Sequence, residues 1–253
     1  MTSEPVRDSV TDHLLTPENA VLVVIDYQPT QVRSIRSMDH QLLLENIVRV
    51  AKIATLFELP VVLSTVNVAS GVNQPTVPEL LDALNGAEQI DRTTINAWED
   101  VEFRAALEAT GRKKIVMTAL WTEACLAFPT LDALRSGYEV YPVVDAIGGT
   151  SPDAHRAALK RVAQAGAKRV GWVQLACELQ RDWARTGTAS DFKEILFGPA
   201  PVVDTTGLGE QRGSGSPRMA AARAPRPPAI GRRRVVRARR GWELRRTCAG
   251  TRG

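Results

Sequence analysis

The 253-residue sequence has few cysteines and no long apolar run. Its three cysteines, Cys125, Cys177 and Cys248, are too few and too scattered for a framework of disulfide bonds. No apolar stretch approaches the roughly 18 residues that a membrane helix needs. The N-terminus has no basic start followed by an apolar stretch, so a secretory signal is not expected. These absences predict a protein of the reducing cytoplasm with no membrane partner.

Several catalytic and nucleotide-binding motifs are also missing. No G-x-G-x-x-G follows the first apolar segment and there is no G-x-x-x-x-G-K-[ST], which disfavours nucleotide binding. The absence of G-x-S-x-G excludes a serine nucleophile elbow. The only histidines, His13, His40 and His155, lie away from the ends of the predicted strands. This disfavours a histidine metal site and a histidine-dependent triad, so we expect no metal and no cofactor.

Charge is distributed unevenly along the chain. Residues 209–253 hold 13 arginines and two acidic residues, a net charge of +11, whereas the whole chain carries +4 and residues 1–208 therefore −7. The same segment lacks apolar periodicity, so it cannot bury enough surface to offset chain entropy. We expect a disordered Arg/Pro-rich tail over 209–253, a flexible lead over 1–17 and one domain over 18–208. A nucleic-acid-binding tail is the alternative, but it depends on charge alone.

The domain alternates apolar segments with amphipathic ones. Continuous apolar runs are typical of buried parallel strands, and apolar residues at helical spacing predict helices. Their alternation predicts a three-layer, doubly wound α/β fold with a six-stranded parallel sheet, order 3-2-1-4-5-6, and helices on both faces. The predicted strands are 20–26, 60–67, 87–93, 113–120, 138–146 and 167–173. The predicted helices are 40–57, 77–85, 98–111, 122–136, 152–166 and 174–185.

Three candidate catalytic residues lie where such a fold places its ligand site, at the carboxyl ends of the strands. Cys125 would lie in the first turn of the helix after the fourth strand, where free N–H groups and the helix dipole stabilise a thiolate. We therefore predict a lowered pKa and alkylation below about pH 8. Asp26 ends the first strand and is a candidate general base. Arg92 lies at the end of the third predicted strand. The alternatives are a buried apolar cysteine, a loop-capping aspartate and a solvated arginine.

Five stretches of the sequence carry a more specific signal. VLVVIDYQ, RTTINAW, TEACLAFP, GYEVYPVVDA and ACELQRDW, within about residues 18–197, together resemble the isochorismatase-like cysteine hydrolases, in particular the YcaC-like branch. The resemblance implies an Asp-Lys-Cys triad, in which Asp26 and Cys125 match and Arg92 stands in the lysine position. It also implies a cis peptide between Leu120 and Trp121, an oxyanion hole formed by the N–H groups of Trp121 and Cys125, and homo-oligomers.

The implied activity is that of a metal-independent cysteine hydrolase acting on a small amide or a related small-molecule substrate. Asp26 would take the thiol proton of Cys125 while Arg92 holds positive charge nearby. Asn96, Trp98 and Glu123 are candidate substrate-binding residues, with core packing or capping as the alternative. The other hypothesis for the whole chain is a catalytically silent, oligomeric binding or scaffold protein.

Two departures from the family pattern bear on that choice. Ala119 stands where the family usually has glycine, and a positive φ there would be strained. Pro142 lies in a strand expected to be central, where it removes a ladder hydrogen bond. Thiol reactivity distinguishes the hydrolase from the scaffold.

Overall fold

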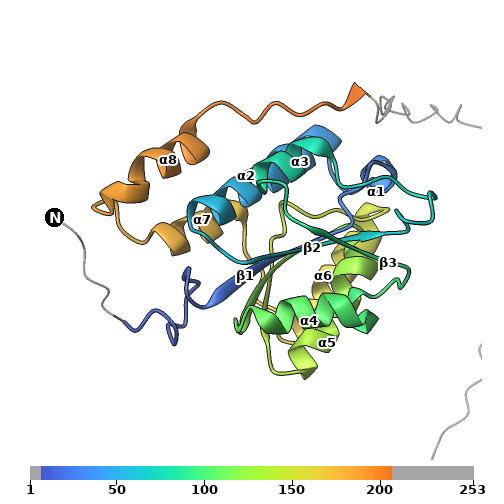
Figure 1. Ribbon diagram of the computed structural model, residues 1–253, viewed down its shortest axis with the longest axis horizontal. Coiled ribbons are helices and arrows are strands. Elements are labelled where there is room, and N and C mark those ends of the chain that lie inside the picture. Colours follow the sequence, from blue (N-terminus) through green and yellow to red (C-terminus); the bar gives the residue numbers. More distant parts are fainter. Residues whose placement is uncertain (1–6, 207–253) are drawn as a thin grey trace, which may run out of the picture. The chain divides into compact units, whose positions relative to one another are not determined.

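A computed structural model describes residues 7–206, which form a parallel sheet with helices on both faces (Figure 1). All strand pairs are parallel, and the order is β3-β2-β1-β4-β5. The predicted α/β class and the order of the first five strands are confirmed. The strands are β1 (Ala20–Ile25), β2 (Val61–Val66), β3 (Gln89–Arg92), β4 (Lys114–Ala119) and β5 (Glu139–Pro142).

The helices form the two outer layers. On one face lie α1, α2, α3, α7 and α8, and on the other α4, α5 and α6 (Figure 1). The bounds are α1 (Pro29–Ser34), α2 (His40–Leu56), α3 (Pro78–Ala83), α4 (Val101–Ala109), α5 (Ala127–Arg135), α6 (Pro152–Gln164), α7 (Trp172–Gln180) and α8 (Thr186–Phe197), with the short turns η1 (Ala97–Glu99) and η2 (Thr122–Leu126). None of the helices in residues 7–206 is long and apolar enough to cross a membrane.

The central strand β1 explains why the sheet is covered on both faces. All six of its residues are buried. Leu22 and Val24 belong to the apolar cluster that contains α2 and α7, whereas Val21, Val23 and Ile25 belong to the cluster with α4 and α5. Side chains alternate between the two faces of a strand, so a continuous apolar run fills both layers.

The predicted sixth strand, residues 167–173, is reduced to an isolated bridge between Val143 and Val170. The carbonyls of Val140 and Pro142 accept hydrogen bonds from Lys168 and Val170, at 2.9 and 3.0 Å. The next bond of a parallel ladder would need an N–H at residue 142, and proline has none. The sheet therefore has five strands rather than six, and α7 begins already at Trp172.

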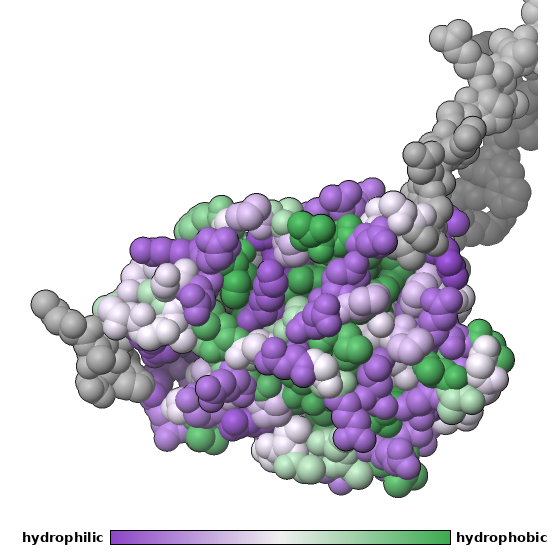
Figure 2. Space-filling model, turned by 45° about the horizontal axis from the view of Figure 1, so that its top comes forward, coloured by the Kyte–Doolittle hydropathy of each residue, from purple (hydrophilic) through white to green (hydrophobic). Residues whose placement is uncertain are grey.

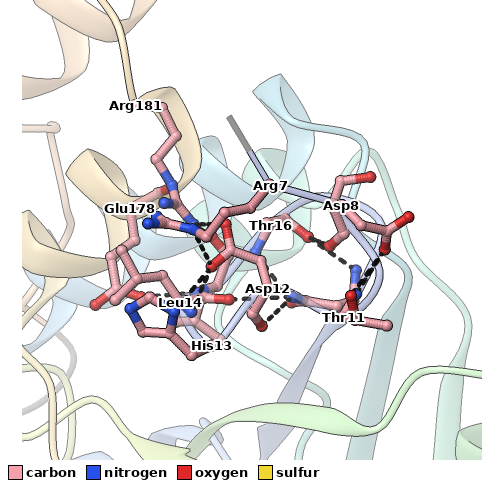
Figure 3. A network of polar contacts seen from close by, with 12 residues as sticks. Arg7, Asp8, Thr11, Asp12, His13, Leu14, Thr16, Glu178 and Arg181 are labelled. Carbon is pink, nitrogen blue, oxygen red and sulfur yellow. Dashed lines mark hydrogen bonds and ion pairs between the residues drawn. The ribbon is translucent and has the colours of Figure 1, made fainter. Parts of the chain in front are cut away.

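Residues 7–17 pack on the domain and are not the flexible lead that the sequence suggested (Figure 3). The carboxylate of Asp12, 7% exposed, lies 3.1 Å from Arg7 Nε and 3.0 Å from Arg181 Nη2, just beyond α7. Leu15 is fully buried, and its N–H donates to the Glu178 carboxylate at 2.8 Å. Contacts between distant residues of this kind leave no local sequence pattern. The expected tail, 209–253, lies outside the described residues.

Asp12 gives a prediction about stability. Burial alone would raise its pKa, but hydrogen bonds from the Leu14 N–H and Arg7, with the charge of Arg181, lower the pKa to about 2. The stabilisation is complete above the unfolded pKa of about 3.9 and is lost as the pH falls through about 2. Urea unfolding at neutral pH should therefore find Asp12→Asn destabilised by about 1–2 kcal/mol, and the difference should shrink in acid.

The matched control is Asp153→Asn. Asp153 also pairs with an arginine, Arg156, but its side chain is 92% exposed. An exposed pair contributes about 0–1 kcal/mol. Equal effects of the two substitutions at neutral pH would contradict the assigned role of Asp12.

Candidate active site

Asp26, Arg92 and Cys125 come together at the carboxyl edge of the sheet. Asp26 directly follows β1, Arg92 ends β3 and Cys125 lies in η2, the turn after β4. Arg92 reaches past β2 to Asp26 and donates from Nη1 to Oδ1 and from Nη2 to Oδ2, both at 2.7 Å. The Cys125 thiol lies beside the same carboxylate, which raises the pKa of the thiol. The three side chains thus form one contiguous chain of contacts.

The Asp26–Arg92 pair is completely buried, since both side chains have 0% exposure. Such a pair is tolerated only when further hydrogen bonds satisfy the charges. Arg92 also donates to Ser64 Oγ at 3.1 Å and to the Thr65 carbonyl at 3.0 Å. Burial would lower the pKa of Arg92, but Asp26 raises it, so the guanidinium stays charged. Arg92 is therefore not a solvated surface charge.

Ser64 and Thr65 were not identified by sequence reasoning. Both lie in β2 and are buried. The only signal was a polar pair in the otherwise apolar run VVLSTV. Asp26 itself has a left-handed backbone, φ 63°. Aspartate adopts this region more readily than most residues, and here it turns the chain out of the sheet immediately after β1.

The environment of Cys125 is the opposite of the one predicted. Burial, followed by the charge and the hydrogen bond of Asp26, raises the pKa of the Cys125 thiol to about 12. The Arg92 cation and the Trp121 N–H act in the other direction but do not outweigh them. The predicted lowering is wrong because a helix terminus cannot compensate for burial beside a carboxylate. At neutral pH Cys125 is a thiol.

The turn that carries Cys125 is a π-helical turn instead of the first turn of an α-helix. The Trp121 carbonyl accepts from Leu126, five residues later, at 3.1 Å, and from Ala124 at 3.2 Å. In an α-helix the donor to this carbonyl would be Cys125. The Leu120–Trp121 peptide is cis, and the backbone N–H of Trp121 acts on the Cys125 thiol and lowers its pKa, although burial outweighs this effect. The backbone at Trp121 thus faces the thiol.

Ala119 does not have the strained backbone considered for it. It is the buried last residue of β4 and pairs with Ile25. Within residues 7–206 the non-glycine residues with positive φ are Asp26, Glu58, Asn67, Asn85 and Arg181. Alanine therefore fits at the end of this strand.

The three candidate substrate-binding residues have structural partners. Asn96 caps η1, accepting from the Trp98 N–H at 3.1 Å and donating to Asp132 at 2.8 Å. The Trp98 ring packs edge-on against Tyr138. Glu123 accepts from the Thr150 N–H at 2.9 Å, and its Oε2 is buried without a hydrogen-bond partner. In this structure Asn96 therefore has the capping role, and Trp98 the packing role, that were the alternatives to substrate binding. Between residues 7 and 206 no group of three His, Cys, Asp or Glu side chains could hold a metal ion.

Comparisons with known proteins identify the family of the chain. A family model for the isochorismatase domain matches residues 20–174. The Escherichia coli protein described as "Probable hydrolase YcaC" is 35% identical over 170 residues, 67% of this chain and 81% of that protein. The structure of Pseudomonas aeruginosa YcaC with hexane-2,5-diol and covalent acrylamide aligns with a TM-score of 0.70 and 36% identity, over 74% of this chain and 92% of that one.

The structure of Escherichia coli YcaC, described as an octameric hydrolase of unknown specificity, aligns with a TM-score of 0.65 and 30% identity, over 77% of this chain and 97% of that one. The segment matched by the family model, residues 20–174, includes Asp26, Arg92 and Cys125. The chain is a hydrolase that belongs to the isochorismatase family.

Proposed function

We propose that the chain is a metal-independent cysteine hydrolase that cleaves a small amide or a related bond. Cys125 is the nucleophile, Asp26 the general base and Arg92 the fixed cation beside them. The observation that carries the proposal is the buried chain of contacts from the Cys125 thiol through the Asp26 carboxylate to the Arg92 guanidinium.

Proton transfer is coupled to attack in this mechanism. Because the pKa of Cys125 is raised to about 12, little thiolate is present beforehand. As the sulfur bonds to the carbonyl carbon, its proton moves to Asp26 and the carbonyl electron pair moves to oxygen. The N–H groups of Trp121 and Cys125 bind that oxyanion. The protonated Asp26 then gives its proton to the leaving amine, which leaves a thioester on Cys125.

Hydrolysis reverses the roles of the same groups. Asp26 takes a proton from water, the hydroxyl attacks the thioester carbon, and the proton returns to the Cys125 sulfur as the acid departs. One water is consumed for each amide bond cleaved. Arg92 does not shuttle protons, since a guanidinium stays charged in proteins. Its role is to hold both oxygens of Asp26 and to offset the negative charge.

The test is alkylation of the native protein by acrylamide, the molecule found covalently in the relative from Pseudomonas aeruginosa. Peptide mass spectrometry should find the adduct on Cys125, although this side chain is only 8% exposed. Exposed Cys177 gives the rate of an ordinary thiol. Cys125→Ser should remove the adduct and all hydrolytic activity. Slower labelling of Cys125 than of Cys177 at neutral pH would favour the catalytically silent scaffold instead.

We extend the proposal to a homo-oligomer, because the similar Escherichia coli protein is described as octameric. Exposed apolar side chains near the catalytic edge are available for such contacts, among them Val72 at 79% and Ile95 at 67%. On the face seen in Figure 2, apolar residues are interspersed among hydrophilic ones. Light scattering of the full chain should give a multiple of 27.6 kDa, and a stable monomer would contradict this part.

A further inference from the structure

The turn that carries Cys125 is held by hydrogen bonds that the proposed mechanism does not use. Thr122 Oγ1 lies 2.8 Å from Nδ1 of His155, in α6. The Thr122 N–H donates to the Gly148 carbonyl at 2.8 Å. The neighbouring Glu123 accepts from both the N–H and the hydroxyl of Thr150. The segment between β5 and α6, together with α6 itself, therefore braces this turn.

These bonds act on the backbone that faces the thiol. Thr122 is fully buried and directly follows Trp121, whose backbone N–H acts on the Cys125 thiol and lowers its pKa. On the other side the Trp121 indole N–H donates to Ser34 Oγ, at the end of α1. The peptide between Trp121 and Thr122 is thus fixed from two elements, α1 and α6. A shift of Thr122 would move the Trp121 N–H away from the reacting centre.

His155 is suited to hold this hydroxyl as a neutral partner. Its side chain is half-buried, and burial lowers its pKa despite the opposing charge of Glu123. The neutral ring forms the hydrogen bond with Thr122 without adding a cation near Cys125. Gly149 lets its own backbone lie close to Glu123 and His155, since a Cβ at this position would be 2.6 Å from Glu123 Oε2 and 3.0 Å from His155 Cβ.

We propose that Thr122 and His155 are positioning residues, which hold the N–H groups of Trp121 and Cys125 in place to bind the oxyanion. The inference rests on the proposed function and deepens it, since neither residue touches the reacting atoms. Both lay outside the sequence-based candidates because a threonine before a helix and a histidine within one have common structural roles.

Two thiol reagents separate oxyanion binding from thiol reactivity. When acrylamide adds, a bond forms between sulfur and the terminal carbon, the alkene electrons shift onto the amide oxygen, and the thiol proton ends on the α-carbon. With iodoacetamide the sulfur–carbon bond forms as the carbon–iodine bond breaks, iodide leaves with the electron pair of that bond, and the thiol proton passes through Asp26 to solvent. Only the first reaction develops an oxyanion, so the ratio of the two rates at Cys125 reports on the N–H groups.

Thr122→Val keeps the shape of the side chain and removes its hydroxyl. We expect Thr122→Val to lower the acrylamide rate at Cys125 about tenfold and the iodoacetamide rate by less than about twofold. A tenfold fall is smaller than the effect of losing an oxyanion donor completely, because the N–H groups are displaced and not removed. Thr122→Ser should restore the ratio. His155→Phe removes Nδ1 and should reproduce the fall, which gives a second route where Thr122→Val does not fold. Thr55→Val is the matched control, since Thr55 donates to the Ala83 carbonyl in another part of the fold.

An unchanged ratio, or an equal fall with both reagents, overturns the proposal, because the hydroxyl would then act on packing or on the thiol alone. Failure of Thr122→Ser to restore the ratio has the same consequence. Failure of the proposed function has a different signature. In that case wild-type Cys125 would react with neither reagent, or the Cys125→Ser protein would gain as much label as the wild type. Either result would also remove the basis for the positioning role.

Discussion

Arg92→Ala is expected to destabilise the fold by about 3–5 kcal/mol, the usual cost of leaving a buried charge without its partner. Asp26 has 0% exposure and both of its oxygens accept from Arg92. Removing the guanidinium therefore strands a carboxylate inside the protein. Urea or thermal unfolding at neutral pH measures the loss directly.

Two further variants distinguish this explanation from a general loss of packing. Arg92→Lys keeps the charge but offers three donors instead of five, so its loss should be smaller. The double variant Asp26→Leu with Arg92→Leu leaves no unpaired charge and should be more stable than Arg92→Ala. Arg156→Ala, which removes a 67% exposed arginine from a surface pair, should change stability by less than about 1 kcal/mol. An Arg92→Ala protein as stable as the wild type would mean that the buried pair does not form in solution.

The meeting of Asp26, Arg92 and Cys125 could be anticipated from the sequence. Asp26 and Cys125 follow apolar strands and Arg92 ends the short polar strand β3, and parallel strands bring their carboxyl ends to one edge. Their chemical state could not be anticipated in the same way. The pKa of Cys125 depends on burial and on the contact with Asp26, and these are set by the packing of separate strands. The π turn at Cys125 likewise depends on tertiary contacts, such as that between Thr122 and His155.

The fold departs from prediction where tertiary contacts decide the outcome. Pro142 was correctly identified as a residue that removes a ladder hydrogen bond, but the consequence, a sixth strand reduced to one bridge, depends on which edge its nitrogen faces. Helix α8 was not expected, because Phe192 is its only buried residue and gives no periodic apolar signal. The docking of residues 7–17 depends on Asp12 meeting Arg181 from the other end of the domain.

The second large effect concerns Asp26 as a base. In the wild type the acrylamide rate at Cys125 should vary little between about pH 6 and pH 9, because the thiol gives its proton to Asp26 and needs no prior ionisation. Asp26→Asn should lower the rate near neutral pH by about 100-fold or more, within the range for loss of a general base. Rates measured by mass spectrometry across this pH range give both profiles.

The pH profile of Asp26→Asn is the decisive measurement, because a structural defect alone would lower the acrylamide rate without changing the slope of rate against pH. Without a base, Cys125 must react as a thiolate, so the rate should rise about tenfold per pH unit below the thiol pKa. Asp26→Asn also removes a negative charge that raises this pKa, so the deficit should shrink as the pH rises. Because Asp26→Asn leaves Arg92 unpaired, Asp26→Asn with Arg92→Met serves as a second variant in which neither charge is stranded. A wild-type rate that itself climbs about tenfold per pH unit would mean that the thiolate forms without Asp26, and the coupled proton transfer would be wrong.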